Sequence, residues 1–307
     1  MTNQTIYIIG SGAIGKALAV FLQLENKNVL LIRGRTDNQP AEKVPITLTD
    51  QNNRKFKQDI ILTTFSNLTN INGIVLIATK AFANEDIADK LKDITGDFSV
   101  VLLQNGLHIE KPFENFQNVY RGVLLSTSQL NGPHNITFKK VDDSPIGPIF
   151  GQNPIPDEIV AQINTPYFGF RKDNDIVKLV WEKVITNCAF NSICPLLETD
   201  NGIFHRDPTV LELAQKIIEE CVEVATSYQI KLDPKTIENK LLLISQRAEG
   251  QLISTYEDIR HKRRTEIDSL NLEITRLAQQ SGKSDSTIHT SLLGKMIQMK
   301  AKIAMSG

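Results

Sequence analysis

Gly10-Ser11-Gly12-Ala13-Ile14-Gly15 follows directly on the apolar run Ile6–Ile9, near the beginning of the 307-residue chain. In this spacing the first glycine permits a tight turn, the second lets a phosphate approach the backbone, and the third lets a helix pack closely on the preceding strand. Apolar residues at helical spacing come next, and then a second apolar run, Asn28–Arg33. The order strand, glycine loop, helix, strand predicts a βαβ unit that binds a dinucleotide at the helix N-terminus. A glycine-rich turn without a ligand is the alternative.

Further apolar runs in the first half of the chain predict that the sheet continues. Gly73–Thr79, Ser99–Leu103 and Val119–Ser126 are short runs of the kind found in parallel strands, which helices cover on both faces. Asn135–Val141 and Gly147–Gly151 are expected to be antiparallel additions, because proline and glycine turns separate them. These features predict a Rossmann-type α/β domain over residues 1–172.

The second half of the chain has a different pattern. Beyond Ile176, glycine and proline are sparse, strand patterns are absent, and apolar residues recur at helical spacing. We therefore expect an all-α domain over residues 173–307. Its predicted helices are Ile176–Asn191, Val210–Ser227, Pro234–Glu249, Leu252–Ile259, Glu266–Ser281 and Ser286–Met305.

Composition and charge narrow the possible partners and surroundings. The formal net charge is −1, from 34 basic and 35 acidic residues, so no overall field attracts nucleic acid or an anionic membrane. Cys188, Cys194 and Cys221 are too few for a disulfide framework, and no Cys/His set has the spacing of metal ligands. The N-terminus has no signal-peptide pattern, and no apolar run approaches the roughly 18 residues of a membrane span. A cytoplasmic protein without a metal is expected.

Cofactor choice in such βαβ units is normally decided at the end of the second strand. NAD-preferring sites carry an acidic residue there, which bonds the ribose 2′-hydroxyl. This chain has Arg33, followed by Gly34 and Arg35, and a guanidinium can bind a 2′-phosphate through two parallel hydrogen bonds. Arg33 therefore favours NADPH, although either arginine could instead be an ordinary solvated surface charge.

A row of polar residues marks the first helix of the second half. Lys183, Asn187 and Asn191 are spaced i, i+4, i+8 and span only about 80° of the helix circumference. Asparagine is a mediocre helix former, so two of them in line with a lysine suggest a chemical role. Amides and an ammonium group could bind and protonate a carbonyl compound with a carboxylate, whereas a solvated polar face is the alternative. A separate apolar stripe is expected to dock this helix: Val177, Trp181, Val184 and Cys188.

Three further stretches carry candidate site residues. Asn105-Gly106 follows a predicted strand, at the edge of the sheet where ligands of open α/β folds bind, although Asn-Gly is also an ordinary turn. Glu266 follows a basic run, residues 261–264, and could equally be a solvated carboxylate paired with arginines. Ser254 and Asp258 share a turn of helix. On an ideal continuous helix Ser254 lies about 120° from Glu266, so a common face is not guaranteed.

With these residues assembled, the chain resembles the ketopantoate reductase (2-dehydropantoate 2-reductase) family over nearly its whole length. The most specific likeness joins the Trp181-x-Lys183-x-x-x-Asn187-x-x-x-Asn191 helix with the distant run Arg263-x-Thr265-Glu266-Ile267-Asp268. The other matching pieces are the loop Gly10–Gly15, Arg33, Asn105-Gly106 and Ser254-x-x-x-Asp258.

The resemblance implies a Rossmann domain followed by a helical domain like that of 6-phosphogluconate dehydrogenase, with a small 2-keto acid bound in the cleft between them. It implies that NADPH gives a hydride to the ketone of ketopantoate while Lys183 protonates the oxygen as general acid. Glu266 would bind the substrate's hydroxyl and help to position Lys183, and Lys80 would lie near the cofactor. The product, pantoate, feeds pantothenate and coenzyme A synthesis. The implied substrate-binding residues are Asn105, Asn187, Asn191 and Ser254, with Asn105 also near the cofactor.

The chain also departs from the family pattern near the substrate. Family members commonly have Asn-Pro-Leu-Thr at the second asparagine of the helix, whereas here the run is Asn191-Ser192-Ile193-Cys194-Pro195-Leu196. Thr255-Tyr256-Glu257 replaces the more usual Ser-Met-x-Gln. Two alternatives therefore stay open: an NADPH-dependent reductase of another 2-keto acid with the same fold, and a catalytically silent NADP-binding regulatory protein. A homodimer is the candidate assembly.

Overall fold

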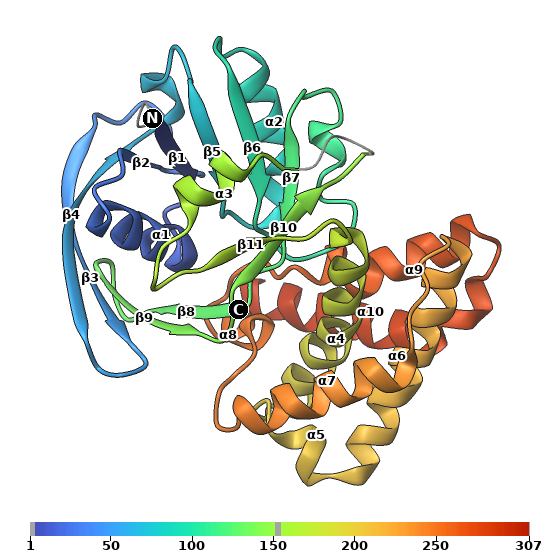
Figure 1. Ribbon diagram of the computed structural model, residues 1–307. Coiled ribbons are helices and arrows are strands. Elements are labelled where there is room, and N and C mark those ends of the chain that lie inside the picture. The colour runs from blue at the N-terminus through green and yellow to red at the C-terminus, as the bar shows by residue number, and fades with distance from the viewer. Residues whose placement is uncertain (1–3, 151–154, 307) are drawn as a thin grey trace. The chain divides into compact units, whose positions relative to one another are not determined.

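The computed structural model describes residues 4–150 and 155–306 (Figure 1). Its contacts group the chain into two compact units: the first is Met1–Gln104 with Ile109–Ile176, and the second is Asn105–His108 with Val177–Gly307. The domain limits inferred from the sequence, 1–172 and 173–307, stay a prediction. The assignment of the short segment Asn105–His108 to the second unit was not foreseen.

The first unit contains a sheet of eleven strands among its described residues. Six neighbouring strands run parallel, in the order β4, β2, β1, β5, β6, β7. The chain leaves β1 for β2 on one side and reaches β5 on the other, so the strand order reverses at β1, as in a nucleotide-binding α/β fold. The Rossmann-type prediction is confirmed. The strands are β1 (Thr5–Ile9), β2 (Val29–Ile32), β3 (Glu42–Asp50), β4 (Lys55–Thr63), β5 (Gly73–Ile77), β6 (Phe98–Leu102), β7 (Val119–Gly122), β8 (Ser126–Leu130), β9 (Asn135–Lys140), β10 (Ser144–Pro148) and β11 (Phe170–Lys172).

The edges of the sheet differ from the expectation. The hairpin of β3 and β4 was not predicted, because one face of it is exposed and its apolar residues only alternate with polar ones. The expected strand Val119–Ser126 is two strands, β7 and β8. The two expected antiparallel additions correspond to β9 and β10, and each has one antiparallel and one parallel neighbour. The second of them, expected over Gly147–Gly151, begins earlier and ends at Pro148, and Gly151 lies outside the described residues.

Helices cover both faces of the parallel strands. Helix α1 (Ala13–Leu24) and helix α3 (Asp157–Ile163) join one core with Ile8 and Leu76 of the sheet. The strand residues that alternate with these are buried too, which agrees with a second covered face. Helix α2 (Asn84–Lys92) follows β5 and buries Ile87 and Leu91. Short 3₁₀ turns complete this unit: η1 (Phe65–Asn67), η2 (Ala81–Ala83) and η3 (Lys111–Phe113).

The regular elements in the described residues of the second unit are all helices, as predicted. The predicted helix Glu266–Ser281 is interrupted, since a 3₁₀ turn and Leu270 precede its main part. The elements are α4 (Ile176–Leu197), α5 (Ile203–Arg206), α6 (Pro208–Ser227), α7 (Pro234–Arg247), α8 (Ser254–Arg260), η4 (Ile267–Ser269), α9 (Asn271–Gln280), η5 (Ser284–Thr287) and α10 (Ile288–Ser306).

Helix α4 is buried around most of its circumference. Trp181, Val184 and Cys188 are buried as predicted, but Val177 is 41% exposed and does not belong to the docking stripe. Residues between the members of this stripe, such as Ile185 and Phe190, are buried as well. A helix with neighbours on several sides buries polar residues that a surface helix would expose.

Candidate active site

The glycine loop connects β1 to α1 in the predicted way. Gly10 has φ +118°, and a Cβ on it would lie 2.8 Å from the backbone of Ala78 and Thr79. A Cβ on Gly15 would lie 1.8 Å from the carbonyl oxygen of Gly10, so only glycine lets α1 approach the loop this closely. Around Gly12, by contrast, no atom lies within 4 Å of that position. Protein atoms therefore pack closely against Gly10 and Gly15, whereas the space beside Gly12 is open.

The start of α1 is suited to an anion. No side chain caps it, and its first turn contains no acidic residue. Helix N-termini carry unpaired N–H groups and a partial positive charge, which favour phosphate. Gly12 is exposed and Ser11 half-buried, and Ala13 and Ile14 begin the helix. A dinucleotide pyrophosphate fits this open, uncapped end.

Arg33 lies directly after β2, and its side chain is only 18% exposed. The guanidinium forms an ion pair with Glu42 at the start of β3. Its other terminal nitrogen, Nη1, is buried without a hydrogen-bond partner. The interpretation of Arg33 as a solvated surface charge is therefore wrong, since the group is mostly buried and paired. Arg35, by contrast, is exposed.

The carboxyl ends of β1, β2 and β5 lie together. Gly10 donates its backbone N–H to the carbonyl oxygen of Ile32 at 2.9 Å, and a Cβ on Gly34 would lie 2.7 Å from Thr79 Cγ2. Lys80 follows Thr79 and is half-buried at the start of η2. Three predicted cofactor elements, the glycine loop, the Arg33 turn and the Lys80 turn, thus share this edge of the sheet.

A buried polar network holds the ends of β5 and β6. Gln104 donates through Nε2 to Thr79 Oγ1 at 3.1 Å and shares a pair of amide hydrogen bonds with Asn84. Asn84 also donates to the carbonyl oxygen of Ile109 at 2.7 Å, and Arg121 donates to the carbonyl oxygen of Gln104 at 3.0 Å. These side chains were not predicted, and they fix the turns next to Lys80 and Asn105.

The polar row on α4 is not a solvated face. Lys183 and Asn187 are half-buried, and Asn191 is only 2% exposed. Asn191 donates through Nδ2 to the carbonyl oxygen of Asn187 at 3.0 Å, while its Oδ1 is buried without a hydrogen-bond partner. A buried acceptor without a donor costs free energy, about 1–3 kcal/mol in typical proteins. A ligand that donates a hydrogen bond to Asn191 would recover it.

Two side chains steady α4 from outside the predicted row. The carbonyl oxygen of Cys188 accepts from Ser192 Oγ at 2.6 Å and from Asn271 Nδ2 of α9 at 3.1 Å. Cys188 is a buried free thiol whose pKa burial raises far above its ordinary range. It is therefore a packing residue and an inert thiol. Pro195 lies within the helix, which continues to Leu197, so the family departure after Asn191 does not end α4 early.

Asn105 belongs to the segment Asn105–His108, which is bonded to η4. Leu107 donates its N–H to the carbonyl oxygen of Ser269 at 2.9 Å. Gly106 has φ +114°, and a Cβ on it would lie 2.6 Å from the Ser269 side chain. Ser269 in turn donates through both N and Oγ to the carbonyl oxygen of Glu266 at 3.0 Å. Ser269 thus contacts both the segment that carries Asn105 and the segment that carries Glu266, two predicted site residues.

The same segment is attached to α9 through a charged cluster. His108 contacts Glu273 through Nδ1 at 2.8 Å, and Arg276 donates to the other oxygen of Glu273 at 2.7 Å. Burial by itself would raise the pKa of Glu273, but these hydrogen bonds and charges lower it to about 2. The carboxylate is therefore ionised at neutral pH and holds His108 in its left-handed conformation, φ +54°.

Ser254 and Glu266 lie on separate elements. Helix α8 ends at Arg260, and the chain turns through Lys262, whose φ is +53°. Ser254 is exposed at the beginning of α8, whereas Glu266 is 8% exposed and precedes η4. Glu266 is therefore not a solvated carboxylate. Asp258 is buried and accepts a hydrogen bond from Arg263 Nε at 2.9 Å, which gives it a structural partner.

Two family models match the chain: "Ketopantoate reductase PanE/ApbA" over residues 6–149, and "Ketopantoate reductase PanE/ApbA C terminal" over residues 175–300. The chain belongs to the ketopantoate reductase family. It is 27% identical to a 2-dehydropantoate 2-reductase from Pyrococcus horikoshii over 281 residues, which cover 89% of this chain and 90% of that one. It is 26% identical to a Streptococcus pyogenes protein of the same name, with 87% and 88% covered.

Solved structures show the same fold as this ketopantoate reductase family member. A D-mandelate dehydrogenase with NADH and anilino(oxo)acetate has a TM-score of 0.85 at 21% identity, covering 98% of this chain and 99% of that one. A dimeric ketopantoate reductase from Staphylococcus aureus has a TM-score of 0.78 at 22% identity, with 98% and 99% covered. Both likenesses extend over the α/β unit and the helical unit.

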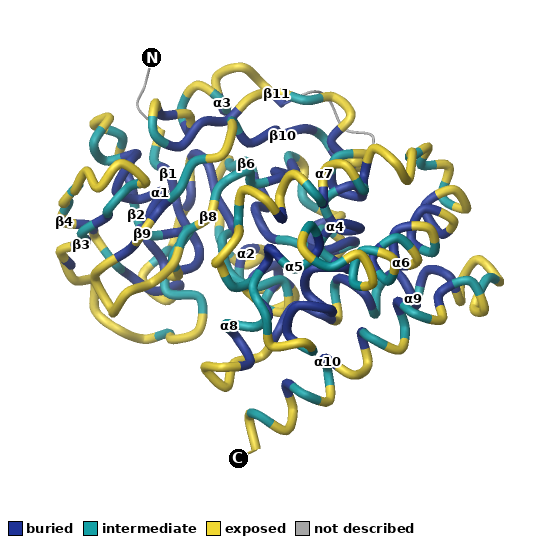
Figure 2. The backbone as a smooth tube through the Cα atoms, turned by 90° about the horizontal axis from the view of Figure 1, so that it is seen from below, coloured by how far each residue is buried: buried dark blue, intermediate teal, exposed yellow. Residues whose placement is uncertain are grey.

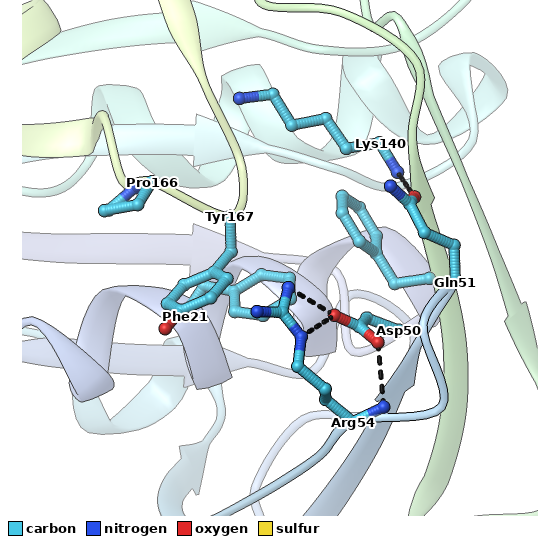
Figure 3. A pocket seen from close by; sticks show the side chains of 8 residues that line it. Phe21, Asp50, Gln51, Arg54, Lys140, Pro166 and Tyr167 are labelled. Atoms are coloured by element: carbon cyan, nitrogen blue, oxygen red, sulfur yellow. Dashed lines mark hydrogen bonds and ion pairs between the residues drawn. The ribbon is translucent and has the colours of Figure 1, made fainter.

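A small cavity of about 100 Å³ lies in the first unit, away from the predicted residues (Figure 3). Arg54 crosses it above Tyr167 and is paired with Asp50 at 2.7 Å, so its charge is already neutralised. Within residues 4–150 and 155–306, no cluster of three or more His, Cys, Asp or Glu side chains has the arrangement of a metal site. No helix in the described part of the chain is long and apolar enough to span a membrane.

Sequence reasoning missed the residues that hold the predicted ones in place. Glu42 pairs with Arg33, Ser269 joins the Asn105 and Glu266 segments, and Asn271 bonds the backbone of α4. Of these three residues, only Glu42 lies in an element that the sequence could have predicted, because the alternation Val44, Ile46, Leu48 of its strand is typical of a half-buried β-strand. The other two depend on contacts between distant segments.

Proposed function

We propose that this protein reduces the ketone of 2-dehydropantoate to pantoate with NADPH, the pantoate-forming step of pantothenate and coenzyme A synthesis. The observation that carries the proposal is the polar row of α4. A half-buried lysine stands in line with a buried asparagine whose acceptor has no partner, inside the segment that matches the family's C-terminal model. Relatives named 2-dehydropantoate 2-reductase cover nearly the whole chain and support the same substrate.

The first unit is proposed to bind the cofactor. The open backbone at Gly12 and the start of α1 bind the pyrophosphate, and the guanidinium of Arg33 donates to the 2′-phosphate. Lys80 and Asn105 lie on the turns after β5 and β6 and hold the nicotinamide half. When bound, NADPH supplies the hydride for the carbonyl carbon.

The second unit is proposed to bind and protonate the substrate. Lys183 gives a proton from Nζ to the carbonyl oxygen, and its ammonium group stabilises the negative charge that develops there. Glu266 accepts a hydrogen bond from the substrate's hydroxyl and orients Lys183. The substrate's carboxylate and carbonyl are bound by neutral side chains, which donate without adding charge: Asn105, Asn187 and Ser254. Asn191 binds the substrate through Oδ1, which accepts a hydrogen bond from the substrate's hydroxyl, shared with Glu266.

The test is NADPH oxidation, followed by absorbance, with ketopantoate and with other branched and aromatic 2-keto acids. The proposal expects the highest kcat/KM for ketopantoate. A second candidate, a reductase of a different 2-keto acid, is favoured by the altered run after Asn191 and by the fold shared with D-mandelate dehydrogenase. A higher kcat/KM for another acid would select this candidate. Tight NADPH binding with no reduction of any acid would instead indicate a silent regulatory protein.

The preference for NADPH has its own test at Arg33. Arg33→Asp removes the donor proposed for the 2′-phosphate and places a carboxylate there. It should weaken NADPH binding much more than NADH binding. Equal weakening of both nucleotides would show that Arg33 does not contact the 2′-phosphate.

The proposal includes a homodimer and a reducing, cytoplasmic setting. Several positions along α10 are exposed (Figure 2), and a row of them is occupied by apolar residues. The row's spacing of three and four residues is that of helix pairing: Ile288, Leu292, Met296, Met299 and Ile303. A relative with the same fold is dimeric. All three cysteines are buried free thiols, which supports a reducing compartment. Light scattering should give twice the monomer mass for the unaltered chain. Leu292→Glu should reduce the measured mass to that of the monomer. Val141→Glu, on the exposed surface of the other unit, should leave the mass unchanged.

A further inference from the structure

The ion pair of Arg33 and Glu42 has a bearing on which nucleotide the protein accepts. Glu42 begins β3 and faces Leu62 across the β3–β4 hairpin, and Leu62 pairs with Leu31 of β2. The hairpin thus brings a carboxylate across the sheet to the end of β2. Its side chain is 53% exposed, whereas that of Arg33 is 18% exposed. The carboxylate therefore lies at the solvent side of a mostly buried guanidinium.

The two terminal nitrogens of Arg33 have different surroundings. Nη2 donates to Glu42, while Nη1 is buried and has no acceptor. A guanidinium normally binds a phosphate through two parallel hydrogen bonds. At Arg33 one terminal nitrogen is buried and the other is already bonded to a carboxylate. A 2′-phosphate on Arg33 must therefore share the guanidinium with a like charge or displace it.

The two nicotinamide nucleotides would respond to this carboxylate in opposite ways. The 2′-phosphate of NADPH is an anion, and a neighbouring carboxylate disfavours it by repulsion, which salt screens only partly at hydrogen-bonding distances. NADH has a neutral 2′-hydroxyl there, which can donate to a carboxylate. Arg33 would hold Glu42 in place for that bond. One residue pair thus contains a donor for the phosphate and an acceptor for the hydroxyl.

We infer that Glu42 is a specificity-determining residue that limits the preference of this protein for NADPH and lets it use NADH as well. The inference rests on the proposed function, in which the Arg33 end of β2 binds the adenosine ribose. Arg33 raises the affinity for NADPH, and Glu42 lowers it while raising the affinity for NADH. The balance between the two nucleotides is therefore a property of the pair.

The experiment measures the dissociation constants of NADPH and NADH, by nucleotide fluorescence, for the full chain and three variants. Glu42→Gln and Glu42→Ala both remove the charge, so each should raise the ratio of NADPH affinity to NADH affinity by roughly tenfold. Asp59→Asn is the matched control. Asp59 lies on the same hairpin, is 54% exposed and pairs with Lys43 at 3.8 Å, so it loses the same charge away from Arg33.

The outcomes separate the inference from the proposed function. If the unaltered chain binds neither nucleotide, the proposed function is wrong. If it binds them and both Glu42 variants change the ratio no more than Asp59→Asn does, only the role of Glu42 is wrong. A thermal unfolding midpoint close to that of the unaltered chain shows that the variants are folded. A selective rise in the ratio supports the inference.

Discussion

The glycine loop after β1 and the polar row of α4 position their chemistry by different means. In the loop the groups proposed to bind the cofactor are backbone N–H groups, and two glycines allow a close approach that any Cβ would block. On α4 the groups proposed to bind the substrate are side chains, and their environment is made by other segments. Asn271 of α9 bonds the backbone of α4, and packing on several sides buries Asn191.

This difference explains why the sequence predicts the geometry of the loop better than the surroundings of the polar row on α4. The geometry of the loop depends on six consecutive residues and the strands beside them, so its motif specifies it almost completely. The spacing of Lys183, Asn187 and Asn191 specifies only that they share a helix face. Whether that face is solvated depends on what packs against it. The following predictions test each half of the comparison.

The largest effect is expected for Lys183→Ala. Loss of the proposed general acid should lower kcat by about 10²–10⁴-fold and leave the dissociation constant of NADPH nearly unchanged, since the other unit is proposed to bind the cofactor. Steady-state kinetics and a nucleotide titration measure the two quantities. Lys178→Ala, at an exposed position on the same helix, is the control and should alter neither. An equal loss of turnover and of NADPH affinity would assign Lys183 to the cofactor.

The glycines of the loop should separate folding from binding. In Gly15→Ala the new Cβ meets the carbonyl oxygen of Gly10 at 1.8 Å, so we expect a loss of about 3 kcal/mol or more in unfolding free energy. In Gly12→Ala the new Cβ meets no protein atom but occupies the approach of the pyrophosphate. That variant should keep its stability and lose at least about tenfold in NADPH affinity, or 1.4 kcal/mol. Denaturant unfolding measures the stability of both variants, and fluorescence titration measures their affinity for NADPH. Normal NADPH binding by Gly12→Ala would contradict the proposed place of the pyrophosphate at Gly12.

Asn191→Leu tests whether the buried amide serves a ligand. The substitution keeps the approximate volume and removes an acceptor that has no partner, together with the hydrogen bond from Nδ2 to Asn187. The two effects oppose each other, so the unfolding free energy should change by no more than about 1 kcal/mol. If Asn191 binds substrate, kcat/KM should fall by about tenfold to a hundredfold. Ser192→Ala is the comparison, because Ser192 bonds only the backbone of α4. A loss of stability with unchanged kcat/KM would make Asn191 a purely structural residue.

The smallest effect concerns Glu273, which holds His108 and Arg276. Its pKa is lowered from 4.5 to about 2 in the folded state, so its ionised form stabilises the fold above pH 4.5, and this contribution is lost as the pH falls toward 2. Glu273→Gln should lower the thermal unfolding midpoint at pH 7 by roughly 2 °C. The difference from the unaltered chain should shrink below pH 4.5.

Calorimetry between pH 7 and pH 3 measures this difference. Glu212→Gln, at an exposed position on α6, is the control and should leave the midpoint unchanged at every pH. A Glu273 effect that is equal at pH 7 and pH 3 would mean that the carboxylate charge does not stabilise the fold.

Features that depend only on neighbouring residues could be predicted from the amino-acid sequence. The glycine loop, the parallel strands after it, the change to helices near Ile176 and the alignment of Lys183 with the two asparagines follow from periods and motifs of a few residues. These patterns record local backbone geometry and which face of an element is apolar. They are therefore visible without any knowledge of what packs against that face.

The partners of these residues, by contrast, depend on how the chain folds. The fold pairs Glu42 of an unpredicted hairpin with Arg33, joins the Asn105 segment to Ser269, and buries Asn191 with its acceptor unpaired. Such contacts connect segments far apart in the chain, and their formation depends on the packing of whole elements. A polar side chain looks the same in a sequence whether it is solvated, paired or buried, because its free energy is set by neighbours that the local pattern does not specify.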